Sequence, residues 1–258
     1  MKKIRVSNPE FERASIPRIS PAEQFVARVL VDNTLCGYKV LINAQLTPQG
    51  RIKVGAETEC KMVEKMVEML PELTTTELRY VNAGSIYDLS TKARMHPNCL
   101  VQPAIIAACM IASGLINKEE AQSAPPTIID LAPDGNGHAR LKKGFSKVKA
   151  TETLLGCNTL IRAKQNDETV KVRLKSDCND VIRFGEEVPE LPASSLRKAN
   201  PGEMIEIAED VGLSPISFVI PNIVSAGWIA TEMVAAGLIE DIEPMSVSFM
   251  PADDELAE

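Results

Sequence analysis

Three cysteines and one histidine in the first half of the chain are the residues best suited to chemistry. Cys36 precedes Gly37, Cys60 follows a polar Thr-Glu pair, and Cys99 ends the run His96-Pro97-Asn98-Cys99. Cysteine thiolates bind soft metals and iron–sulfur clusters, and they attack electrophiles. Three thiolates with His96 would complete a four-ligand set, whereas three thiolates alone would leave one coordination position open. The spacings match no compact ligand motif, so only the fold can bring these residues together.

The three cysteines occupy similar places in the expected local structure. Cys36 lies in a loop between two strands, Cys60 lies where a third strand gives way to a helix, and Cys99 lies just ahead of an apolar helix. Backbone N–H groups at a helix N-terminus favour negative charge, so we expect these thiols to be shifted toward thiolate.

Two other interpretations of the cysteines stay open. Free cysteine is among the most buried residue types, so each one could simply pack in a core, and Cys109 inside an apolar helix is expected to do so. Alternatively, Cys99 with His96 could form a nucleophile–base pair of a thiol enzyme, although nothing identifies an orienting third residue or a substrate.

The chain contains an internal repeat. Residues 52–112 align with residues 170–230 without a gap, and 19 of the 61 aligned pairs are identical, which indicates a duplication. Cys60 corresponds to Cys178, but Leu155 and Ser217 stand opposite Cys36 and Cys99. We therefore expect the first copy to hold the cysteine site and the second to be structural.

Hydrophobic periodicity predicts the same elements in both copies. The alternating segments predict strands over 25–31, 38–46, 51–57, 145–151, 159–164 and 170–175, and a short strand over 127–131 between the two copies. The three- and four-residue spacings predict helices over 62–70, from about 85, and over 101–116, 181–188, 203–211 and 219–239.

The expected fold class is α+β. We expect two tandem similar lobes, each of three antiparallel strands followed by three helices, packed as a pseudo-twofold fused dimer. The expected divisions are an extended arm (1–24), lobe one (25–116), a linker (117–143), lobe two (144–241), and a C-terminal strand with an acidic tail (242–258).

Composition excludes some classes of function. The net charge of −7 argues against nucleic-acid partners and against binding an anionic membrane surface. The N-terminus lacks the apolar stretch of a signal peptide, and the longest apolar run, over 100–116, is marginal for a membrane span. We therefore expect no membrane insertion, a cytoplasmic protein, and reduced thiols rather than a disulfide scaffold.

The cysteine motifs resemble those of a small uncharacterised protein family of anaerobic archaea and bacteria, about one lobe long. The corresponding segments are Cys36-Gly37, Thr58-Glu59-Cys60, and the run from His96 through Cys99 to Pro103. The first lobe departs from the family pattern in having Glu59 for aspartate and one extra residue before the helix proline. The resemblance implies a joint role for the three cysteines and an anaerobic context, and it implies no activity.

These observations predict a metal- or iron–sulfur-binding protein of anaerobic metabolism. Cys36, Cys60 and Cys99, with His96 as a further metal ligand, would hold an iron–sulfur cluster or a soft transition metal for redox or cofactor assembly. The alternative is a non-catalytic scaffold subunit whose partners are other proteins of a larger complex. The substrate, if there is one, is not indicated.

Overall fold

The computed structural model describes residues 26–131, 143–197, 201–235, 238–239 and 242–251. The predicted N-terminal arm (1–24) and the acidic tail (253–258) lie outside the described residues.

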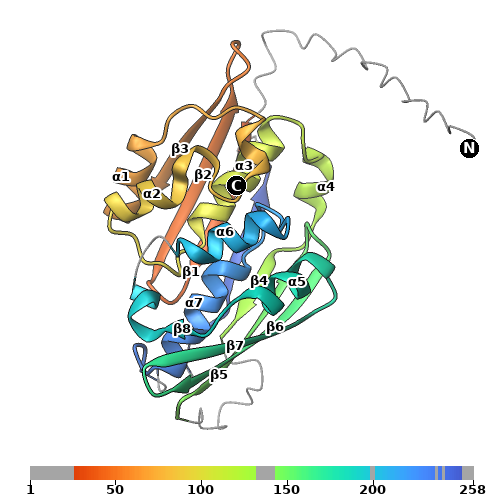
Figure 1. The fold of residues 1–258 in the computed structure, drawn as a ribbon. Coiled ribbons are helices and arrows are strands. Elements are labelled where there is room, and N and C mark those ends of the chain that lie inside the picture. The colour runs from red at the N-terminus through yellow and green to blue at the C-terminus, as the bar shows by residue number, and fades with distance from the viewer. Residues whose placement is uncertain (1–25, 132–142, 198–200, 236–237, 240–241, 252–258) are drawn as a thin grey trace, which may run out of the picture.

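The described residues form one nine-stranded sheet with the order β3-β2-β1-β9-β4-β5-β6-β7-β8 (Figure 1). Every pair of neighbouring strands in it is antiparallel. The strands are β1 (Val26–Asn33), β2 (Tyr38–Leu46), β3 (Ile52–Thr58), β4 (Thr127–Asp130), β5 (Phe145–Glu152), β6 (Cys157–Asn166), β7 (Thr169–Ser176), β8 (Leu191–Pro192) and β9 (Met245–Met250).

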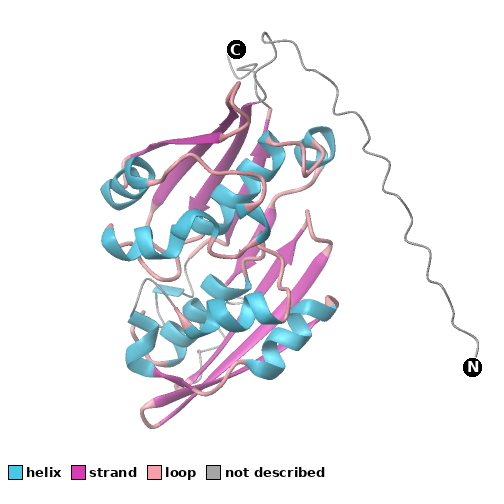
Figure 2. Ribbon diagram, turned by 45° about the horizontal axis from the view of Figure 1, so that its top comes forward, coloured by secondary structure: helices cyan, strands magenta, loops and turns pink. Residues whose placement is uncertain are grey.

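Seven α-helices are described, and the longer ones lie over one face of this sheet (Figure 2). They are α1 (Lys61–Met69), α2 (Ile86–Lys92), α3 (Val101–Ala112), α4 (Lys118–Ser123), α5 (Asn179–Glu187), α6 (Glu203–Asp210) and α7 (Val219–Ala230). Helix α3 packs on β1 and β2, and α7 packs on β5 and β6. Both are apolar nearly all round, as expected for helices with neighbours on several sides.

The prediction of two lobes packed as a fused dimer is wrong, because the sheet is continuous. Strand β9 pairs with β1 on one side and with β4 on the other, and β4 pairs with β5. Strands β9 and β4 therefore join β1–β3 to β5–β7. Its alternation of Met245, Val247 and Phe249 with polar residues makes it a half-buried strand. By filling this gap it removes two exposed strand edges, which would otherwise invite aggregation.

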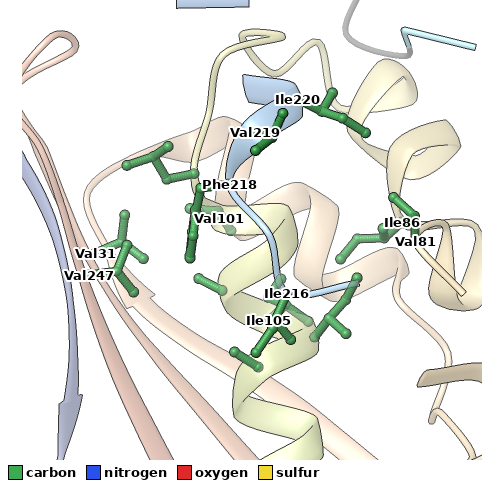
Figure 3. Packing of buried hydrophobic residues seen from close by; sticks show 14 of the residues in the cluster. Val31, Val81, Ile86, Val101, Ile105, Ile216, Phe218, Val219, Ile220 and Val247 are labelled. Carbon is green, nitrogen blue, oxygen red and sulfur yellow. The ribbon is translucent and has the colours of Figure 1, made fainter. Parts of the chain in front are cut away.

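The hydrophobic core is also continuous. One cluster of buried side chains includes Val31 and Val247 of the central strands, Val101 and Ile105 of α3, and Phe218 ahead of α7 (Figure 3). A chain of two separately packed lobes would instead bury two cores, so the apolar helices cover a shared interior.

Three segments differ from their predicted boundaries. The helix predicted over 101–116 ends at Ala112. The helix predicted to reach residue 239 ends at Ala230, and Glu232 just beyond it adopts a positive φ of 57°. The stretch over 117–143, predicted to be a linker with a short strand over 127–131, also contains α4. The short strand is confirmed as β4, and it is an integral strand of the sheet.

The two aligned parts of the chain hold corresponding elements within this one sheet. We call residues 26–112 the first region and residues 145–230 the second region. Helices α1 and α5 begin 118 residues apart (179 − 61), as do α3 and α7 (219 − 101). Each position of the candidate site can therefore be compared with its counterpart.

Candidate metal centre

Cys36 is placed by the tight connection between β1 and β2. The backbone N–H groups of Cys36 and Gly37 both donate to the carbonyl oxygen of Asn33, at 3.2 and 2.9 Å. Gly37 has a φ of +75°, which an L side chain rarely adopts, so glycine suits this turn. The turn leaves the Cys36 side chain half-buried, with its Sγ 3.5 Å from the same carbonyl oxygen.

Cys60 is placed by the junction of β3 and α1. It is the N-cap residue of α1, with an extended backbone, and its own N–H donates to Oγ1 of Thr58 at 3.1 Å. The hydroxyl of Thr58 thus supports the turn that points Cys60 into the protein, where the residue is 6% exposed.

Cys99 and His96 are placed by the turn between α2 and α3. The N–H of Cys99 donates to the carbonyl oxygen of His96 at 3.0 Å, which closes a short turn just before α3. Cys99 is half-buried, whereas His96 is exposed at the outer end of this turn.

The structure brings the three predicted cysteines and His96 to one small pocket. Its lining residues are Asn33, Cys36, Cys60, Met62, Val63, Met95, His96 and Cys99. The pocket encloses about 20 Å³, which is room for a single water-sized group. It is rich in sulfur, because two methionine thioethers join the three thiols.

Asn33 adds an unpaired polar atom to this pocket. Its side chain is buried, with the residue 4% exposed, and its Oδ1 has no hydrogen-bond partner in the described part of the chain. An unsatisfied buried acceptor costs about 1–3 kcal/mol. A ligand that offers a donor or a positive charge in the pocket would recover this cost.

Burial keeps two of the thiols protonated, which corrects the expected shift toward thiolate. Burial raises the pKa of Cys99 to about 12, against the lowering effect of the backbone N–H of Val101. Burial likewise raises the pKa of Cys36, and the backbone N–H of Tyr38 opposes this rise. Negative charge on the neighbouring cysteines raises both pKa values further. The N–H donors are present, but desolvation outweighs them.

The sulfurs lie near one another without forming a compact ligand set. Among the described residues, the groups of three or more potential ligands whose atoms lie within 4.8 Å of one another include no three of Cys36, Cys60, Cys99 and His96. Tetrahedral binding to one zinc ion places sulfurs roughly 3.8 Å apart. The thiols would therefore have to rotate inward to share one ion.

The outer end of the pocket touches the second region through an aromatic contact that the sequence did not indicate. The rings of His96 and Trp228 of α7 have centroids 6.1 Å apart and meet edge to face. The indole N–H of Trp228 donates to the carbonyl oxygen of Leu196 at 2.7 Å, which holds the ring in place. Trp228 is the one tryptophan of the chain, so its fluorescence reports on this pocket.

The second region holds different chemistry at the counterpart positions. Glu152, which replaces Asn33, is 2% exposed and accepts hydrogen bonds from Oγ of Ser217 at 3.3 Å and from the N–H of Phe218 at 3.2 Å. Burial raises the pKa of Glu152 to about 7, although both hydrogen bonds lower it. Ser217 replaces Cys99. At this place the second region therefore has a hydrogen bond between Ser217 and Glu152, whereas the first region has a sulfur-lined pocket.

The two remaining cysteines of that region form a disulfide, contrary to the expectation of reduced thiols. Cys157 and Cys178 are bonded to each other, with their Cα atoms 5.7 Å apart. Together with Asp177 they form a compact group of potential metal ligands. The sulfurs are bonded to each other, and the Asp177 carboxylate accepts two hydrogen bonds from Asn158, so this group is not a metal centre in this state.

Cys109 lies apart from the pocket. It is fully buried in α3, and burial raises the pKa of its thiol. It is therefore a packing residue, and it offers a control for experiments on the pocket.

One of the comparisons with known proteins finds a similarity over part of the chain. A model of a family of unknown function (DUF6951) matches residues 27–123, which include Cys36, Cys60, His96 and Cys99. The match agrees with the resemblance to an uncharacterised family, and it covers less than half of the chain. No curated protein and no solved structure matches the chain significantly.

The helices give no sign of a membrane-spanning segment. Within the described ranges, none of them combines the length and the apolar character needed to cross a bilayer.

Proposed function

We propose that this protein binds one soft transition-metal ion with Cys36, Cys60 and Cys99, and with His96 as the fourth ligand. The observation that carries the proposal is the pocket itself. Three thiols distant in sequence, a histidine and an unpaired buried amide oxygen line the same small space. Thiolate and imidazole together favour soft or borderline ions such as zinc and copper(I).

The electrostatics of the pocket support a positively charged ligand. The thiols raise one another's pKa through like-charge repulsion, which a bound cation would cancel. The N–H groups of Val101 and Tyr38 already point at two of the sulfurs, and such donors stabilise metal-bound thiolates.

The size of the pocket favours one ion over an iron–sulfur cluster. A cavity of about 20 Å³ admits a single ion after small rotations of the thiols. A cluster of several iron and sulfide atoms would need the turn at Cys36 or the turn at His96 to move outward. The proposal keeps the expected cytoplasmic and anaerobic context and a use in redox or cofactor assembly. It requires Cys36, Cys60 and Cys99 to stay reduced, as they are in this structure beside the Cys157–Cys178 disulfide.

Metal titration under anaerobic conditions tests the proposal. The wild-type protein should bind one Co²⁺ or Zn²⁺ per chain, with thiolate-to-cobalt absorption and a change in Trp228 fluorescence. Cys36→Ser with Cys99→Ser should abolish both signals, whereas Cys109→Ala should leave them unchanged. The proposal fails if the wild-type protein retains no ion, or if the double variant binds as well as the wild type.

Reconstitution with iron and sulfide separates a single ion from a cluster. A stable brown protein with cluster absorption would replace the single-ion proposal by the iron–sulfur alternative. The scaffold alternative makes a different prediction, because association with other subunits should then survive Cys36→Ala with Cys99→Ala.

A further inference from the structure

Strands β6 and β7 carry four basic side chains on the sheet face that points away from the helices. Arg162 and Lys164 on β6, and Lys171 and Arg173 on β7, are exposed, while the residues between them are buried beneath α7 and α5. The alternation of strand side chains therefore places all four cations on one surface.

The strand register sets these cations directly opposite one another. Arg162 pairs with Arg173, and Lys164 pairs with Lys171. Like charges at directly opposed positions of an antiparallel pair are destabilising. Lys171 has an acidic partner in Glu190, at 3.1 Å, but the described residues provide no ion pair for Arg162, Lys164 or Arg173.

A groove lies over these pairs. It encloses about 410 Å³ and is lined by the four cations with Phe145, Ala163 and Asn166. This volume falls in the range of small-molecule sites, roughly 300–1,000 Å³. The half-buried ring of Phe145, which stands opposite Lys164 in the register, gives the groove one apolar wall.

The counterpart surface of the first region shows that the fold does not require these charges. The aligned positions on β2 and β3 pair Asn43 with Gly55 and Gln45 with Lys53. Asn43 donates to Glu57 at 3.0 Å, so polar side chains satisfy one another there. The equivalent strands β2 and β3 thus pair with one cation at these four positions, whereas β6 and β7 carry four.

We propose that this groove binds a small phosphorylated molecule of the nucleotide class. The four cations would contact phosphate oxygens, with the arginines suited to bidentate contacts, and the planar base would lie against Phe145. A long nucleic acid fits less well. Charges interact over roughly 8 Å at physiological salt, so a ligand confined to the groove feels mainly its cations, whereas a polymer would also meet a surface whose net charge is −7.

Titration calorimetry of the full chain with ADP and with inorganic pyrophosphate tests this proposal. Both should bind, and Arg162→Gln with Arg173→Gln should weaken both by about tenfold or more. Phe145→Leu should weaken ADP but not pyrophosphate, because pyrophosphate has no ring. Glu190→Gln should strengthen pyrophosphate binding, because it removes the acidic competitor for Lys171.

The control is Lys53→Gln, the position aligned with Lys171 on the counterpart surface, which should change neither affinity. Lys164→Gln provides a single substitution in case the double arginine variant folds poorly. Absence of ADP and pyrophosphate binding would overturn the proposal, as would equal binding by the Lys164→Gln and Lys53→Gln variants. Binding of a single-stranded RNA oligomer without binding of ADP would overturn it in favour of a nucleic-acid surface.

Discussion

The two aligned regions place different side chains on matching pieces of backbone. The sulfur-lined pocket of the first region is lined by Asn33, Cys36 and Cys99, and the Oδ1 of Asn33 has no hydrogen-bond partner among the described residues. At the counterpart positions Glu152 and Ser217 are hydrogen-bonded to each other. The comparison teaches that the framework tolerates either arrangement. Cys36 and Cys99 are therefore not needed for the fold, because Leu155 and Ser217 stand at their positions in the second region. This is the condition for attributing a separate function to them.

Transferring the polar pair into the first region should have the largest effect. Asn33→Glu with Cys99→Ser would recreate the Glu152–Ser217 hydrogen bond and remove one ligand. Loss of an outer contact to a metal ligand typically costs 10–100-fold in affinity, so loss of a ligand should cost at least about 1,000-fold. Competition with a chromophoric chelator measures the affinity, and Cys109→Ala is the control, which should leave the affinity unchanged. Unchanged affinity in the double variant would show that the pocket does not bind the ion.

Glu152 should make stability depend on pH. Its pKa is raised to about 7 from an ordinary value of 4.5, so between these values the folded state binds more protons than the unfolded state. The contribution of Glu152 to stability should therefore be complete below pH 4.5 and fall as the pH rises to 7, with a loss of up to about 3 kcal/mol in all.

Denaturant unfolding at pH 5 and pH 8 measures this loss. Glu152→Gln should remove most of the difference between the two pH values, because its side chain does not titrate. Glu186→Gln, an exposed substitution on α5, is the control and should keep the wild-type difference. A wild-type protein that is equally stable at both pH values would argue against a titrating Glu152.

The disulfide distinguishes the second region in a different way. Cys157 and Cys178 are separated by 21 residues, and closing a loop of this length stabilises a protein by about 3 kcal/mol. Reductant should lower the free energy of unfolding by this amount. It should leave the metal affinity unchanged, because neither Cys157 nor Cys178 lines the pocket of Cys36, Cys60 and Cys99. Unfolding with and without reductant measures the change, and Cys157→Ala with Cys178→Ala should be insensitive to reductant. A loss of metal binding on reduction would link the two sites.

Local patterns in the sequence predicted much of the framework. The strand over 38–46 and the start of the helix at Val101 coincide with β2 and α3, because alternation and helical spacing are local signals. The position of β9 between β1 and β4 is a long-range pairing that no local pattern contains. Together with β4, this strand turns the two expected lobes into a single sheet.

The candidate site also combines features that local sequence patterns indicate with contacts that only the fold creates. Each cysteine lies at the end of an element, which a sequence can indicate, and the structure brings these ends together at one pocket. The Cys157–Cys178 bond depends on how the start of β6 lies against the N-cap residue of α5, and the contact of His96 with Trp228 depends on where α7 packs. For the contact of His96 with Trp228, the only signal in the sequence was that the chain has a single tryptophan.

The smallest expected effect concerns the opposed cations of the second region. Arg173→Gln removes one member of the like-charge pair with Arg162, so it should stabilise the protein by roughly 0.5 kcal/mol. Lys53→Gln in the first region should give no such gain, because its opposed residue, Gln45, is uncharged. Urea unfolding measures both, and the gain should shrink at high salt, where the repulsion is screened. If Arg173→Gln instead destabilises the protein at low salt, the arginine has a structural partner. The four cations of the second region would then be explained by stability rather than by ligand binding.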